Sequence, residues 1–179
     1  MKKASHVKVL AYGLICWFLT TMPNAFADTQ ATLSPNGYGA ITIGMSPTEA
    51  SRALGIPLVT SPDEVVNDEC YHVQPQSGPT ELSLMIQQGV IVRISLYHGP
   101  SSIATDKGVR LGDPSSKVIQ LYGPALSNEE HEYLGPIGRY LTWWDKTLQL
   151  GIRYETDTNE EVYRIHVGND AITFVEGCS

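Results

Sequence analysis

The sequence predicts an α+β fold in which two tandem strand–helix–hairpin repeats pack their helices on an antiparallel sheet. Three observations predict this fold. The segment from Ile41 to Gly55 is typical of a short strand, a tight turn and a capped helix that ends at a glycine. The same pattern returns 68 residues later, without a gap, from Val109 to Gly123. Alternating apolar and polar residues, typical of β-hairpins, follow each segment.

The two predicted helices share their start and end signals. Ser46-Pro47-Thr48-Glu49 is a capping box, in which the Ser46 hydroxyl and the Glu49 carboxylate satisfy backbone amides of the first turn. Asp113 is the predicted N-cap of the second helix, with Pro114 at its first position. The apolar positions also correspond: Ala50, Ala53 and Leu54 match Val118, Leu121 and Tyr122. Because so short a helix is unstable alone, each copy must dock on a sheet.

The strands are predicted from alternation and from the turns between them. A capping box at Ser61-Pro62-Asp63-Glu64 adds a turn or two of helix before Asn67, and Gly99–Ser102 links the halves. The predicted repeats, 28–100 and 101–179, are either two halves or one compact domain. We expect strands at Gly37–Ile43, Glu69–Gln74, Leu82–Gln87, Val90–Tyr97, Glu129–Leu134, Arg139–Trp144, Leu148–Tyr154, Glu161–Val167 and Ile172–Val175.

The first 27 residues are predicted to be a secretory signal peptide. Three lysines precede an apolar core from Val9 to Leu19, and Ala25-Phe26-Ala27 supplies a cleavage site before Asp28. A membrane anchor is the alternative, but the apolar run is shorter than the roughly 20 residues that a span needs. Ile15 stands before Cys16 where a lipoprotein site needs a small residue, so no membrane anchor is expected after cleavage. We therefore predict a periplasmic or secreted protein.

The processed chain is strongly acidic. Removing the signal leaves 9 of the 12 lysines and arginines and all 19 acidic residues, a formal net charge of −10. This charge argues against nucleic acid and against an anionic membrane surface as partners. It permits a basic protein partner in the periplasm. The alternative is that the acidity serves solubility alone.

Two cysteines, Cys70 and Cys178, remain after processing. In an oxidising compartment two cysteines imply one disulfide. A metal-binding or catalytic thiol is the alternative, but no histidine or second cysteine lies at metal spacing near either. The histidines that survive processing match no metal signature, and we predict neither a metal nor a cofactor. These histidines are His72, His98, His131 and His166.

The stretch from Glu129 to Trp144 is the most suggestive of recognition. It mixes acids, tyrosines, an arginine and two consecutive tryptophans around one turn, and such residue types dominate binding hot spots. Consecutive tryptophans in a strand point to opposite faces, so one of them faces solvent or a second layer. The alternative is that the aromatic residues fill the core. The candidate binding residues are Tyr133, Arg139, Tyr140, Trp143 and Trp144.

The paired segments Ile41–Gly55 and Val109–Gly123 resemble small exported modules of Gram-negative bacteria. They are similar to the repeat of the secreted β-lactamase-inhibitor protein and to small outer-membrane assembly lipoproteins, in which such a segment opens a helical element on an antiparallel sheet. The Tyr133–Pro136, Gly138–Leu141 and Val175–Ser179 segments resemble those of proteobacterial secreted proteins with tandem repeats. The resemblance implies the fold and export but no activity.

We therefore predict an exported binding or inhibitor module that grips a protein through its sheet face and the Tyr133–Trp144 hairpin, without catalysis. One alternative is a cell-envelope hydrolase with Glu130, His131 or Glu132 as acid or base, since paired carboxylates can do such work. Adjacent Glu129 and Glu130 cannot converge in a strand unless the backbone bulges. A second alternative is a structural accessory of envelope assembly. The sequence does not indicate the oligomeric state.

Overall fold

The computed structural model describes residues 31–60, 69–97, 99 and 101–178. The predicted signal peptide, the capping box at 61–64 and His98 lie outside the described residues. Within these residues, no helix combines the length and apolar character needed to span a membrane.

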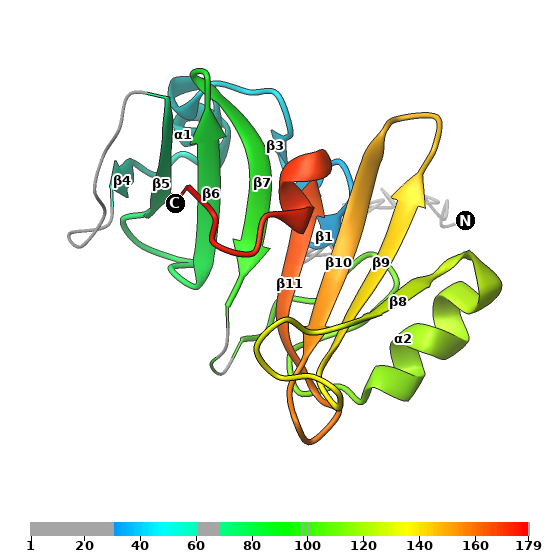
Figure 1. Cartoon of the computed structure of the whole chain (residues 1–179). Coiled ribbons are helices and arrows are strands. Elements are labelled where there is room, and N and C mark those ends of the chain that lie inside the picture. The colour runs from blue at the N-terminus through cyan, green and yellow to red at the C-terminus, as the bar shows by residue number, and fades with distance from the viewer. Residues whose placement is uncertain (1–30, 61–68, 98, 100, 179) are drawn as a thin grey trace, which may run out of the picture.

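An eight-stranded antiparallel sheet dominates the fold (Figure 1). Its two halves meet where Leu96 pairs with Ile165 and Ser95 pairs with His166, so strands from both sides of the predicted linker form one sheet. In spatial order the strands are β4 (Leu58–Thr60), β5 (Cys70–Pro75), β6 (Leu82–Gln87), β7 (Val90–Leu96), β11 (Val162–Gly168), β10 (Leu150–Thr156), β9 (Arg139–Asp145) and β8 (Ser127–Glu130).

A smaller sheet and the first helix cover the rear face of the large sheet, as viewed in Figure 1. The small sheet comprises β1 (Leu33–Ser34), β2 (Gly37–Tyr38) and β3 (Ile41–Thr42), and it leads into α1 (Pro47–Leu54). Leu33 and Ile41 are fully buried in one apolar core with residues from β6, β7, β10 and β11. That core includes Leu84, Ile94, Ile152, Tyr154 and Ile165.

The predicted fold class is wrong, because the protein is mostly β and not a pair of repeats with helices packed on a sheet. The predicted hairpins exist, but β7 and β11 join them edge to edge through backbone hydrogen bonds. The only α-helices in the described residues, α1 and α2 (Ser115–Tyr122), have eight residues each. Each buries one or two side chains, which is too little apolar surface to form a helical layer.

The two helix starts differ from each other. Ser46 and Glu49 form the predicted capping box, since each side chain bonds the backbone amide of the other. Asp113, however, is not an N-cap. Its carboxylate accepts from the Arg110 amide and from Lys117, and Pro114 takes the N-cap position without a side-chain cap. Two predicted apolar positions, Ala53 and Leu121, are exposed.

The end of the chain contains a 3₁₀ turn, η2 (Asp170–Thr173), where the sequence predicts an edge strand at Ile172–Val175. The Asn169 side chain accepts from the Ala171 amide and so favours the turn. A second short 3₁₀ turn, η1 (Gly123–Ala125), follows α2. Beyond η2 the chain crosses in front of β7 and β6 (Figure 1), where Cys178 is disulfide-bonded to Cys70 of β5.

Candidate functional site

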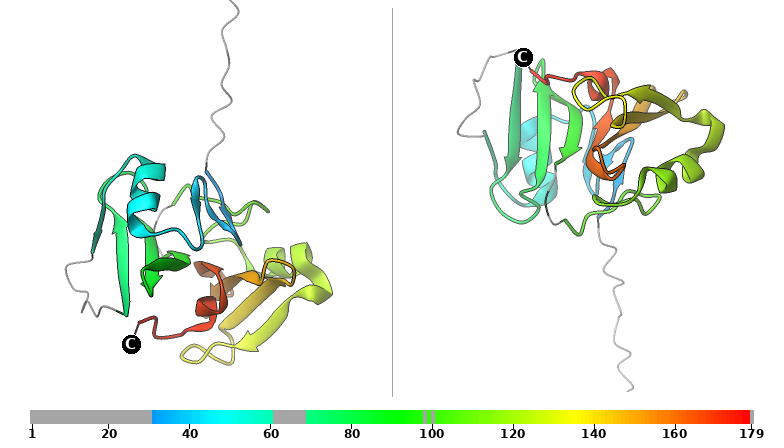
Figure 2. Two further views of the ribbon diagram at one scale, coloured as in Figure 1. Left: turned by 90° about the horizontal axis from the view of Figure 1, so that it is seen from above. Right: turned by 60° about the horizontal axis from the view of Figure 1, so that its bottom comes forward.

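A half-open cavity of about 510 Å³ lies on the front face of the large sheet. Its walls are the 131–138 turn that follows β8 and the C-terminal segment 174–177. Both run in front of the sheet in Figure 1, on the side that faces the bottom of the left view in Figure 2. A cavity of this volume is in the range that holds a small molecule. The polar residues that define it are Arg93, His131, Glu155, Tyr163, Arg164 and His166.

Strand alternation places these polar residues on one face. The side chains of Ile152 and Tyr154 in β10 point into the core. Successive side chains of a strand alternate between its faces, so the next residue, Glu155, points to the front face and into the cavity. A bulge in β11 aligns Glu155 with Arg164 and Thr156 with Val162, which leaves Tyr163 as the extra residue. Because of this bulge, the consecutive residues Tyr163 and Arg164 both line the cavity.

Glu155 lies at the centre of the cavity floor and is 5% exposed. Its Oε1 lies 3.0 Å from Nε2 of His166, and its Oε2 accepts from the Tyr163 hydroxyl at 3.0 Å. Arg164 lies 3.5 Å from Oε2. Burial alone would raise the pKa of Glu155, but the hydrogen bonds from His166 and Tyr163 and the charge of Arg164 outweigh it and lower the pKa to about 2. Glu155 is therefore a fixed, ionised acceptor.

His131 connects the 131–138 turn to this floor. Its Nδ1 accepts from the backbone amides of Tyr133 and Leu134, which assigns the ring proton to Nε2. That Nε2 lies 2.8 Å from the Tyr163 hydroxyl and 3.4 Å from Glu155. The ring also stacks on Tyr140, with centroids 4.4 Å apart. These contacts fix the turn against the sheet.

His166 lies between Glu155 and Ser95, with its Nδ1 2.7 Å from the Ser95 hydroxyl. Burial lowers the pKa of His166 to about 4, and the charges of Arg93 and Arg164 act in the same direction. The neutral ring therefore donates from Nε2 to Glu155 and accepts from Ser95. Serine, histidine and a carboxylate are the components of a catalytic triad. Ser95, however, is 1% exposed and is not among the described residues that line the cavity, so its oxygen does not face a substrate there.

Two guanidinium groups complete the cavity. Arg93 is 3% exposed and donates from Nη1 to the carbonyls of Ala171 and Phe174 at 3.0 and 2.9 Å, which holds the C-terminal wall. Arg164 lies over the rings of Tyr97 and Tyr163, 5.4 and 5.1 Å from their centroids. Such stacking fixes the plane of a guanidinium.

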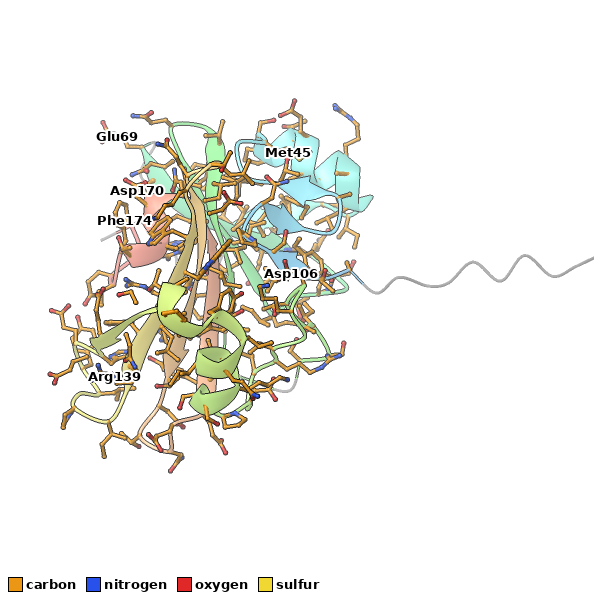
Figure 3. All side chains as sticks on the ribbon, turned by 90° about the vertical axis from the view of Figure 1, so that its right-hand side faces the viewer. Met45, Glu69, Asp106, Arg139, Asp170 and Phe174 are labelled. Carbon is orange, nitrogen blue, oxygen red and sulfur yellow. A yellow bond between two sulfur atoms is a disulfide. The ribbon has the colours of Figure 1, made fainter. Side chains whose placement is uncertain are left out.

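The structure separates the five predicted binding residues. Tyr133 and Tyr140 line the cavity, although Tyr140 is buried and only Tyr133 is well exposed. Trp143 points to the opposite face and packs against the main core. Arg139 donates to Asn128 across β8 and β9, and Figure 3 shows it well apart from Phe174 of the C-terminal wall.

Trp144 lines a second, adjoining hollow of about 450 Å³. Three glutamates of the predicted hydrolase stretch also line it, and all three are exposed: Glu129, Glu130 and Glu132. Arg153 borders this hollow and is held by Thr142 at 3.0 Å and by the face of Tyr140. The hydrolase residues are therefore divided, because His131 faces the first cavity and the glutamates face the second.

Sequence reasoning missed the residues that form the cavity floor: Arg93, Glu155, Arg164 and His166. Their signal is present in the sequence. Each of these residues alternates with strongly apolar residues along its strand. A charged side chain in the middle of a strand is rarely buried without a partner. That pattern predicts a polar layer over the second face of the sheet.

Among the described residues, no group of three histidine, cysteine, aspartate or glutamate side chains is placed to hold a metal ion. No protein-family model, curated protein or solved structure matches the chain. The resemblance to β-lactamase-inhibitor and assembly-lipoprotein repeats therefore stays a prediction. The geometry of the cavity is the basis for a functional proposal.

Proposed function

We propose that the protein is a binding module without catalytic activity, and that its ligand occupies the cavity over β11. The observation that carries this proposal is the fixed floor, where hydrogen bonds hold the carboxylate of Glu155 and the ring of His131 in place. Glu155 is held by His166 and Tyr163, and His131 is held by the amides of its own turn. A concave site with preorganised polar groups and aromatic walls is typical of ligand binding.

Binding is favoured over general acid–base catalysis by the protonation properties of the floor. A general acid or base works best with a pKa near the working pH. The pKa values of Glu155 and His166 are both lowered, to about 2 and about 4, so neither group exchanges protons readily near neutral pH. This observation supports binding over acid–base catalysis by Glu155 and His166. Of the residues of the hydrolase alternative, Glu130 and Glu132 face the second hollow and not this floor.

A matched pair of variants tests the site. Tyr133 is a 64% exposed wall residue of the cavity, whereas Ile137 is exposed in the same turn but outside the cavity lining. Ligand-detected NMR on the disulfide-bonded chain, with a set of small aromatic compounds of different charge, would report binding. We expect Tyr133→Ala to weaken the bound compounds several-fold and Ile137→Ala to leave them unchanged. Equal effects of the two substitutions, or no bound compound at all, would refute the proposal.

The predicted basic protein partner and the periplasmic location stay proposals as well. The adjoining hollow supports the former, because exposed glutamates surround Trp144 there. Pull-down from a periplasmic extract with wild type and Trp144→Ala tests it. Recovery of a partner by the wild type and its loss with Trp144→Ala is the expected result. Equal recovery by both proteins would remove this surface from consideration.

A further inference from the structure

We infer that the cavity binds a small organic anion and that its carboxylate or phosphate group contacts Arg93 and Arg164. This inference rests on the proposed binding function and names the chemistry of its ligand.

The floor of the cavity carries more positive than negative charge, although the protein is acidic. The full chain has a formal net charge of −7. The described cavity lining contains two arginines and two glutamates, but Glu176 belongs to the rim, where the Tyr133 hydroxyl donates to it. Only Glu155 faces the two guanidinium groups at the floor. One positive charge there is left without a carboxylate.

Arg93 is the less compensated of the two guanidinium groups, because Glu155 acts on its charge only from beyond ion-pair distance. Within the described residues no carboxylate lies within ion-pair distance of it, and its Nε has no hydrogen-bond partner although the atom is buried. Its hydrogen bonds are to the neutral carbonyls of Ala171 and Phe174 and to the side chain of Tyr97. A buried charge is costly unless it is paired, so an anion beside Arg93 relieves an energetic cost that the unliganded protein carries.

Arg164 is placed to share that anion. Its side chain is 34% exposed, and the rings of Tyr97 and Tyr163 fix its plane. Its Nε is also buried without a hydrogen-bond partner among the described residues. A planar guanidinium whose faces are covered by rings presents its N–H groups at the edge, which is the geometry that carboxylate and phosphate oxygens match.

The remaining lining determines the kind of molecule that carries the anion. The ring of Tyr133 and the side chains of Leu134, Phe174 and Val175 form the outer walls. These walls are apolar or aromatic, whereas the floor is charged. A compact molecule with an apolar or aromatic body and one oxyanion fits this division, with the body between the walls and the anion at the floor.

A probe series with one ring and different charges tests the inference. Benzoate and phenyl phosphate carry the two oxyanions, benzyl alcohol is neutral and benzylamine is cationic. Titration calorimetry and ligand-detected NMR on the full disulfide-bonded chain would give their relative affinities. We expect at least one of the two anions to bind about tenfold more tightly than the neutral and cationic probes, a difference of about 1.4 kcal/mol. The ratio of benzoate to phenyl phosphate identifies the preferred oxyanion.

Arg164→Gln and Arg139→Gln are matched variants, because each removes one arginine from a strand of the large sheet. Arg164, in β11, lines the cavity, whereas Arg139, in β9, does not. Partial exposure of Arg164 allows the variant to fold, which near-UV circular dichroism would check. We expect Arg164→Gln to remove the anion preference and Arg139→Gln to retain it. Equal or tighter binding of the neutral or cationic probe, sensitive to Tyr133→Ala, would overturn the anion inference alone. Absence of any binding that responds to Tyr133→Ala would overturn the proposed function with it.

Discussion

The carboxylate of Glu155 lies 3.0 Å from Nε2 of His166, and both side chains are buried where β10 and β11 run side by side. The pair sits on the face of the sheet that does not form the main apolar core. Ser95 continues the row onto β7, at the seam between the two halves of the sheet. A polar row that crosses this seam makes folding stability sensitive to protonation.

Stability should decrease on acidification, first through His166. Its pKa is lowered to about 4 by burial, so between pH 6.5 and pH 4 the unfolded chain binds a proton there that the folded chain does not. The free energy of unfolding therefore falls as the pH falls through this window, by roughly 2–3 kcal/mol. The lowered pKa of Glu155, about 2, extends the loss from about pH 4.5 downward.

Urea denaturation at a series of pH values measures this dependence. His166→Gln should flatten the curve between pH 6.5 and pH 4, because the titrating group is absent. Ser95→Ala is the control, since it removes the hydroxyl beside Nδ1 but keeps the imidazole, and it should shift the curve without flattening it. An unchanged slope in His166→Gln would assign the dependence to other groups.

The disulfide should stabilise both the fold and the cavity wall. Cys70 and Cys178 are 108 residues apart in sequence, and the chain-entropy model gives about 4–5 kcal/mol for a closed loop of this size. The wall residues 174–177 lie between η2 and Cys178. We expect the double variant Cys70→Ser/Cys178→Ser to lose several kcal/mol of stability and to bind the cavity probes more weakly. Adding a thiol reductant should lower the free energy of unfolding of the wild type by a similar amount and leave the double variant unchanged. A wild type whose stability is unaffected by reduction of the disulfide would contradict this role.

Tyr122 of α2 should be coupled to Tyr154 of β10, because their hydroxyls are 3.0 Å apart in the core. Burial raises the pKa of both groups, that of Tyr154 to about 12, so both stay protonated and hydrogen-bonded. Tyr122→Phe leaves the Tyr154 hydroxyl without this partner and should cost about 1 kcal/mol. A double-mutant cycle with Tyr154→Phe measures the coupling. Strictly additive losses would show that the two hydroxyls do not stabilise each other.

The hairpins and the first helix could be predicted because their signals are local. Leu82–Gln87 and Val90–Leu96 alternate on either side of a Gln88-Gly89 turn, and the sequence predicts this pairing. The pairing of β7 with β11 could not be predicted. The two strands pair through backbone hydrogen bonds, and no residue pattern in either strand specifies the other as its neighbour. The similarity of the two helix segments then suggested a helical layer that two eight-residue helices cannot form.

The candidate site was only partly predictable for a related reason. Tyr133 and Tyr140 belong to the predicted stretch and do line the cavity. Arg93 and Arg164 lie far apart in sequence, and only the seam between the halves brings them to one floor. The bulge places Tyr163 and Arg164 on the same side of the sheet. A prediction that assumes regular alternation of side chains along a strand cannot detect it.

The consecutive tryptophans of β9 should have separate roles, because the strand points them to opposite faces. Trp143 packs against the main core, with its ring 5.6 Å from that of Tyr122, whereas Trp144 lies over Gly151 and lines the second hollow. Trp143→Ala should cost about 3 kcal/mol, since it leaves a cavity against the core. Trp144→Ala should lower the free energy of unfolding clearly less. Its main effect should be on the recovery of a protein partner in the pull-down. Chemical denaturation of both variants measures the difference, and equal destabilisation would contradict the assignment of the two faces.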